Sequence, residues 1–229
     1  MAFDRELEFA RAAAISAGDN AIRIQTTGIS AKVKPDGSPV TTADTDNERL
    51  LRELIETAYP DDGILGEEGT RKEGNSGRRW ILDPIDGTRD FIKGKPDWCV
   101  LIALEERGEP VVGVAHFPLL AESYWASRGA GAYQNGELLR LSGVEGHSET
   151  PMSQFLSLLW MERGFGSGQT GGWFERRGAI WDLAAPQVIV EEAGGRCFAP
   201  DGSRRNDAGS AIACTTALES QVRTFLGLA

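Results

Sequence analysis

Apolar segments of strand length recur between residues 79 and 126, and they restrict the fold more than any other feature of the sequence. Each is rich in apolar residues, and the Arg107–Pro110 turn predicts that two of them form a hairpin. The predicted strands cover residues 79–83, 98–105, 110–117 and 122–126.

Before these strands, apolar residues at spacings of three and four predict two amphipathic helices. These helices cover residues 4–26 and 42–58, and the second is expected to bury Leu50, Leu51, Leu54 and Ile55. A short strand is expected at 64–66, and a polar loop at 71–78.

The second half of the chain has a different pattern. Composition shifts near residue 141, and 142–178 is rich in Gly and Ser. We therefore expect an α+β lobe over 1–141 and a smaller α/β lobe over 142–229. A helix is predicted from Asp182 to about Ala193, with Pro186 tolerated in its first turn. A strand near 209–214 and a last helix from 217 follow.

Bulk properties exclude several classes of protein. The formal net charge is −10, and no long basic run offsets it, so we expect no nucleic-acid partner. No stretch of 18 apolar residues predicts a membrane span, and the N-terminal residues do not resemble a signal peptide. The three cysteines (Cys99, Cys197 and Cys214) form no Cys-x-x-Cys pair and are interpreted as reduced core residues of a cytoplasmic protein.

The segment Asp83-Pro84-Ile85-Asp86-Gly87-Thr88 follows one of the apolar strands. Two carboxylates three residues apart at the end of a strand can converge on one point, and Mg²⁺ binds such hard oxygen ligands. Gly87 lets the backbone approach a ligand closely, and the N–H groups that follow can hold an anion. An ordinary capped turn is the simpler alternative for an Asp-Gly pair by itself.

Further acidic residues favour the metal site over the capped turn. Glu67 and Glu68 are predicted on a preceding strand, and Asp182 at the start of a helix. Carboxylates that gather without matching lysines are typical of a site for a metal ion.

These motifs, in this order, resemble the inositol monophosphatase family. The resemblance rests on Gly66-Glu67-Glu68, Trp80–Thr88 with Phe91, Trp181-Asp182 and Glu192–Gly195. It implies a layered αβαβα sugar-phosphatase-like fold with the site between the two lobes, and a homodimer. It also implies two or three Mg²⁺ ions, inhibition by Li⁺, and hydrolysis of a small phosphate monoester by metal-activated water.

The resemblance also implies roles for individual residues. Glu67, Asp83 and the carbonyl of Ile85 would hold the first Mg²⁺, and Asp83, Asp86 and Asp182 the second. Glu67 and Thr88, the latter paired with Asp44 of Val40-Thr-Thr-Ala-Asp44, would orient the attacking water. The N–H groups of Gly87 and Thr88 would hold the phosphate. Lys34 would lie near the metals, and Glu175 would bind a substrate hydroxyl, with an exposed loop charge as the alternative reading of Glu175.

The sequence departs from the family pattern in one region. The passage over 142–178 is shorter than the family's, and its Gly-rich run at 163–172 is interpreted as a connector. Substrate choice is therefore open. Thr88–Ile92 and Gly94–Trp98 resemble the histidinol-phosphate phosphatase branch, with inositol-1-phosphate as the other main candidate. The alternative function is that of a catalytically weak relative that binds a metal or a partner protein.

Overall fold

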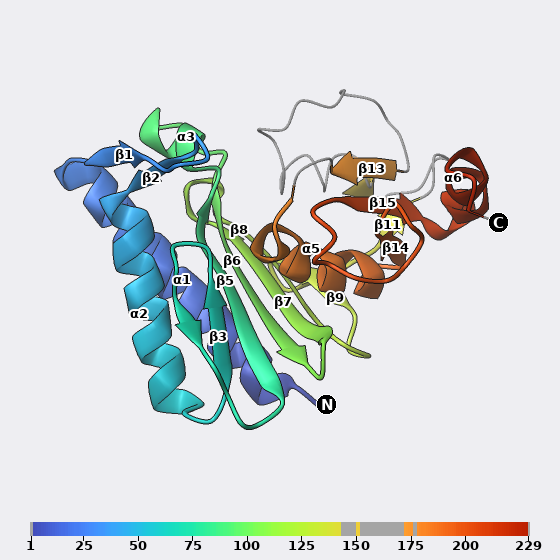
Figure 1. Cartoon of the computed structure of the whole chain (residues 1–229), viewed down its shortest axis with the longest axis horizontal. Helices are drawn as coiled ribbons and strands as arrows, with labels where there is room; N and C mark the ends of the chain where they lie inside the picture. Colours follow the sequence, from blue (N-terminus) through green and yellow to red (C-terminus); the bar gives the residue numbers. More distant parts are fainter. Residues whose placement is uncertain (1, 143–149, 152–171, 176–177, 229) are drawn as a thin grey trace.

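Helices and sheets alternate in five layers (Figure 1). The structure is a computed structural model, and it describes residues 2–142, 150–151, 172–175 and 178–228. Helices α1 and α2 cover one face of an eight-stranded sheet, and α5 covers the other face. A three-stranded sheet packs on the far side of α5, and α6 covers its outer face. The fold class expected from the sequence, a layered α/β arrangement, is confirmed.

The helices are α1 (Asp4–Thr27), α2 (Thr42–Ala58), α3 (Thr88–Ile92), α5 (Ile180–Glu192) and α6 (Glu219–Phe225). The strands of the eight-stranded sheet are β3 (Gly63–Gly66), β4 (Arg71–Lys72), β5 (Arg78–Asp86), β6 (Cys99–Glu106), β7 (Glu109–Phe117), β8 (Glu122–Ser127), β9 (Ala132–Gln134) and β10 (Glu137–Leu139). The three-stranded sheet contains β13 (Gly172–Glu175), β14 (Gly195–Phe198) and β15 (Ala211–Thr215). Two further pairs are β1 (Ala31–Val33) with β2 (Pro39–Thr41), and β11 (Leu141–Ser142) with β12 (Thr150–Pro151).

The eight-stranded sheet has strand order β10-β9-β8-β7-β6-β5-β3-β4. Its neighbouring strands are antiparallel except β3 and β5, which run parallel. The central strand β6 explains why the sequence shows a continuous apolar run there. Leu101 and Ala103 face α5, whereas Val100 and Ile102 face α1 and α2, so both faces of this strand are buried.

The three-stranded sheet, with order β13-β15-β14, shares one apolar core with α5 and a second with α6. Cys197 lies in the first of these cores and Cys214 in the second. Cys99 is buried at the start of β6. All three thiols are free and buried, which confirms the interpretation of the cysteines as core residues.

Most predicted elements agree with the structure within a few residues, but several details differ. Helix α5 begins at Ile180, so Pro186 lies in its interior rather than in its first turn. Leu50 and Leu54 are only half-buried, because the inner face of α2 also contains polar residues. Arg71 and Lys72, expected in a loop, form the short edge strand β4.

Several expectations concern residues outside the described ranges. They include nearly all of the Gly-rich run at 163–172 and most of the shortened passage at 142–178. The lobe boundary near 141 stays a prediction. Among the described residues, no helix is long and apolar enough to cross a membrane.

A row of small residues lets α5 approach the large sheet. Ala103, Gly113 and Ala126 lie side by side on β6, β7 and β8. At Gly113 a Cβ atom would lie 2.4 Å from the carbonyl oxygen of Ala185 in α5. Because that neighbour is backbone, the helix itself would have to move to accommodate any side chain.

We expect Gly113→Ala to lower the free energy of unfolding by about 1–3 kcal/mol, since overpacking forces the backbone apart. Urea unfolding measures the change. Gly108→Asn is the matched control, because Gly108 has a φ of +83° that Asn tolerates and no atom within 4 Å of its ideal Cβ position. Equal stability of Gly113→Ala and the parent protein would contradict the close packing of α5.

Candidate active site

The end of β5 contains an irregularity that turns two carboxylates to the same side. Asp83 lies opposite Leu101 of β6, and Asp86 lies opposite Cys99, so the register shifts between them. In a regular strand, residues three apart face opposite sides. Pro84, which lacks the N–H that a ladder requires, lies at this shift. Because Leu101 and Cys99 both face α5, Asp83 and Asp86 also lie on that side of the sheet.

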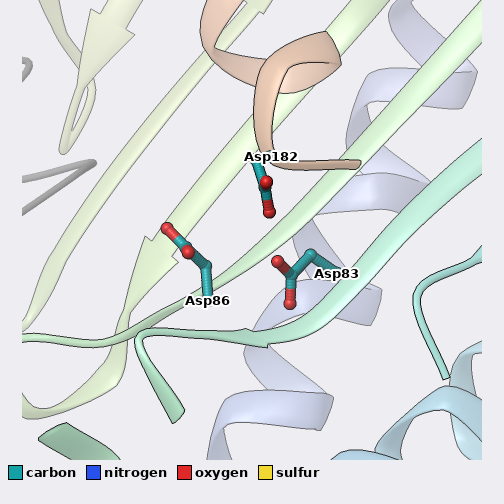
Figure 2. A group of neighbouring side chains, drawn as sticks. All are labelled: Asp83, Asp86 and Asp182. Atoms are coloured by element: carbon teal, nitrogen blue, oxygen red, sulfur yellow. The ribbon is translucent and has the colours of Figure 1, made fainter. Parts of the chain in front are cut away.

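Helix α5 supplies a third carboxylate from the opposite direction. Asp182 lies in its first turn, and its carboxylate accepts a 2.7 Å hydrogen bond from the N–H of Ala179. Figure 2 shows the side chains of Asp83, Asp86 and Asp182 gathered around one space. One oxygen atom from each lies within 4.8 Å of the others. The structure thus brings together three acids that are up to 99 residues apart in the chain, counting from Asp83 to Asp182.

A cavity of about 400 Å³ opens over the three acids. Its volume is in the range of small-molecule sites. Predicted site residues line it: Glu67, Asp83, Ile85, Asp86, Gly87, Thr88 and Asp182. The rest of the lining comes from the β1–β2 hairpin, with Asp36, Gly37, Ser38 and Pro39, and from α3, with Arg89.

The buried carboxyl of Asp83 is strongly perturbed. Burial raises the pKa of Asp83 well above its ordinary value, and the charges of Glu67, Asp86 and Asp182 raise it further. Each of these effects disfavours the ionised form. A cation bound among these oxygens would reverse the balance, because it would offset both the lost hydration and the repulsion.

Glu67 borders the cavity beside this cluster, in the turn that follows β3. Its backbone N–H donates to the carbonyl of Leu82 at 3.1 Å, which extends the contact between β3 and β5 by one residue. Glu67 and Glu68 were predicted on a strand; this was wrong, because β3 ends at Gly66. In a turn, successive side chains need not alternate between faces, and both carboxylates can reach one partner.

Lys34 is the partner that the carboxylates of Glu67 and Glu68 share. Its ammonium group contacts Glu67 at 2.8 Å and Glu68 at 2.7 Å. Burial acts to lower the pKa of Lys34, but the hydrogen bonds and charges of the two acids outweigh it, so the pKa is raised. Burial likewise raises the pKa of Glu68 to about 7, against the effect of Lys34. Lys34 is therefore a charged contact of Glu67 at the edge of the cavity.

Asp44 and Thr88 meet as the sequence predicts. The Thr88 hydroxyl lies 3.3 Å from a carboxylate oxygen of Asp44 and 3.1 Å from the carbonyl oxygen of Ile85. The other oxygen of Asp44 accepts hydrogen bonds from the N–H and the hydroxyl of Thr41, the cap of α2. Burial raises the pKa of Asp44, and the hydrogen bonds from Thr41 and Thr88 oppose this effect.

Gly87 is required at its position for two reasons. Its φ is +90°, in the left-handed region that other residues adopt at a cost. A Cβ atom there would also lie 2.8 Å from the carbonyl oxygen of Asp97. The chain can therefore turn from β5 into α3 at this point only with glycine.

Glu175 is placed differently from the other predicted site residues. It ends β13, where only 2% of it is exposed, so the alternative reading as an exposed loop charge was wrong. It is not among the residues that line the cavity. Its role toward substrate stays a prediction.

Glu48 is a residue that the sequence analysis missed. It is buried on α2, one turn after Asp44, and its two carboxylate oxygens accept the N–H groups of Glu68 and Thr70, each at 2.7 Å. Gly66 packs directly against it, since a Cβ at Gly66 would lie 2.2 Å from Glu48 Oε2. The signal available in the sequence was its spacing of four residues from Asp44, which places both acids on the same face of a predicted helix. Glu48 anchors the turn that carries Glu67.

The geometry agrees with comparisons to known proteins. The model of the inositol monophosphatase family matches residues 4–164 and 165–225. The chain belongs to the inositol monophosphatase family. A histidinol-phosphatase of Chlorobaculum parvum is 40% identical, over 72% of this chain and 74% of its own. A histidinol-phosphatase of Mycobacterium tuberculosis is 37% identical, over 84% and 86%.

A solved structure has a similar fold. The extragenic suppressor protein suhB from Bartonella henselae superposes with a TM-score of 0.82 at 26% identity, and the match covers 97% of this chain and 98% of that one. As a member of the inositol monophosphatase family the protein is a phosphoric monoester hydrolase, as predicted. The alternative, a catalytically weak metal- or partner-binding relative, is not favoured.

The family is metal-dependent, and the residues present fit a hard divalent cation. The three clustered ligands are all carboxylates, and two of them, Asp83 and Asp182, are buried. Oxygen-only donor sets suit Mg²⁺, Ca²⁺ or Mn²⁺, whereas zinc and copper sites use nitrogen or sulfur. The nearest thiol, Cys99, contacts Asp86 at 3.9 Å, and burial raises its pKa, which keeps it from acting as a thiolate ligand.

We expect Glu48→Gln to lower the free energy of unfolding by about 1–3 kcal/mol, because its amide group would face an N–H donor that then lacks an acceptor. The amide hydrogens of Glu68 and Thr70 should also exchange faster with solvent. Urea unfolding and hydrogen exchange measure the two effects. Glu53→Gln, at an exposed position of the same helix, is the control. Unchanged exchange at Glu68 and Thr70 would refute the anchoring role of Glu48.

Proposed function

We propose that the protein hydrolyses a small phosphate monoester of the histidinol phosphate or inositol-1-phosphate type, with Mg²⁺ as cofactor. The convergence of Asp83, Asp86 and Asp182 within 4.8 Å, at the wall of a small-molecule cavity, is the observation that carries the proposal. A phosphate ester enters such an acidic cavity only with cations that neutralise it. The named relatives favour histidinol phosphate as the first substrate to test.

The proposed metal ligands are those that the family resemblance implies, and the convergence of Asp83, Asp86 and Asp182 supports the second set. Glu67, Asp83 and the carbonyl of Ile85 would hold one ion, and Asp83, Asp86 and Asp182 a second. Bound Mg²⁺ polarises phosphoryl oxygens and lowers the pKa of a water molecule. Asp83 is shared between the two sets, which accords with its position at the centre of the charges that raise its pKa.

The chain's own residues would orient the nucleophile and the phosphate. Asp44, held by Thr41, fixes the hydroxyl of Thr88 at the wall of the cavity, where that oxygen can accept a hydrogen bond from a water molecule. Glu67 would act as the base, as the family resemblance implies; its carboxylate lines the cavity and contacts Lys34 at 2.8 Å. The N–H groups of Gly87 and Thr88 would hold the phosphate. Glu175 is proposed from the family resemblance alone, and so is the homodimer.

Phosphate release from histidinol phosphate, inositol-1-phosphate and an adenosine bisphosphate tests the function. We expect turnover of one of the two monoesters with Mg²⁺, and none in the presence of excess chelator, because unscreened carboxylates would repel the phosphate. Li⁺ is expected to inhibit. Absence of turnover for every compound with Mg²⁺ would refute the phosphatase proposal, and full activity in chelator would refute its metal dependence.

The variant Asp86→Asn tests the site. We expect it to lower kcat/KM more than about 100-fold, above the 10- to 100-fold typical of changes around a metal ligand. The change is isosteric, so folding should be retained. Asp46→Asn is the matched control, since Asp46 lies at the exposed side of α2 and pairs only with Arg49 among the described residues. Full activity of Asp86→Asn would exclude Asp86 as a ligand.

A further inference from the structure

The cavity contains one cationic side chain for which neither the sequence analysis nor the family roles provide a function. Arg89 lines the cavity together with five acids: Asp36, Glu67, Asp83, Asp86 and Asp182. It is the residue directly after Thr88, in the first turn of α3. In the described part of the chain, no other lysine or arginine lines this cavity.

Among the described residues, the guanidinium of Arg89 has no partner that would explain its presence. Its side chain makes no hydrogen bond or ion pair with any residue in the described ranges, and it is exposed to solvent. The adjacent acid does not engage it, because Asp90 is buried and pairs with Lys95 at 2.7 Å and Lys93 at 3.9 Å. The other cation at this site, Lys34, is already paired with Glu67 and Glu68. Arg89 is thus the cation available to a ligand.

We propose that Arg89 binds the phosphoryl group of the substrate. This inference rests on the proposed function and assigns one contact within it. The planar fork of a guanidinium donates two parallel hydrogen bonds to phosphate oxygens, a geometry that an ammonium group does not provide. The clustered carboxylates are proposed to hold the cations. Among the described residues that line the cavity, Arg89 is therefore the cationic side chain that can add a direct contact to the phosphoryl group.

Removing Arg89 should weaken phosphate binding while the fold is retained, since a side chain without partners contributes little to stability. In Arg89→Ala, we expect the dissociation constant of inorganic phosphate, measured by calorimetry with saturating Mg²⁺, to rise about 10- to 100-fold. The KM for the monoester should rise by a similar factor. Arg89→Lys should recover part of the loss, because it keeps the charge but not the fork.

Lys93→Ala is the matched control. It removes the same charge from the end of the same short helix, but Lys93 does not line the cavity. The phosphate affinity of Lys93→Ala should change by less than about twofold, because an exposed charge that does not contact the ligand is screened. An equal loss of phosphate affinity in Lys93→Ala and Arg89→Ala would show that the effect comes from net charge alone. It would overturn the proposed contact between Arg89 and the phosphoryl group.

The calorimetric titration separates this inference from the proposed function. If the protein turns over no ester, the proposed function fails, but phosphate binding still tests Arg89. Unchanged phosphate affinity in Arg89→Ala, or no phosphate binding by the parent protein with Mg²⁺, would overturn the inference. A raised KM for one ester with unchanged phosphate affinity would place Arg89 on the alcohol part of the substrate, and would also overturn it.

Discussion

Repulsion among Asp83, Asp86 and Asp182 is the constraint that the surrounding structure has to overcome. Carboxylates this close repel one another, and burial together with the charges of Asp86 and Asp182 raises the pKa of Asp83. Two are held together by the register shift at the end of β5. The third is held by α5, which approaches the sheet over Gly113 and orients Asp182 through the N–H of Ala179. The fold thus supplies the free energy that keeps a cation site assembled.

Helix α2 links the remaining parts of the site through one buried polar face. Asp44 holds Thr88, and Glu48 holds the turn of Glu67. Between them, Asn47 donates to the carbonyl of Ala17 in α1 and accepts from Asn20. Buried polar groups are costly unless each finds a partner, so these contacts also fix how α2 lies against its neighbours. The polar contacts that hold α2 against its neighbours therefore also hold Thr88 and Glu67 at a fixed distance from each other.

Much of this structure could be predicted from local patterns. The helix at 42–58, the strands from 79 to 126 and the convergence of Asp83 with Asp86 all follow from periodicity and from Pro84. Errors arose where distant contacts override local signals. Leu50 was expected inside, but the inner face of α2 is taken by Asp44, Asn47 and Glu48. Pro186 was expected in a first turn, but α5 starts two residues before Asp182.

The sequence by itself determined the family and the set of acids, because their order and spacing along the chain are local properties. Only the tertiary structure decided which side chains share a cavity. Whether Asp86 faces α5 depends on its pairing with Cys99, and whether Lys34 is free depends on Glu67 and Glu68. The same holds for Arg89, which local sequence leaves as an ordinary helix residue. Its place in a cavity lined by five carboxylates follows from segments that are distant in the chain and meet only in the folded protein.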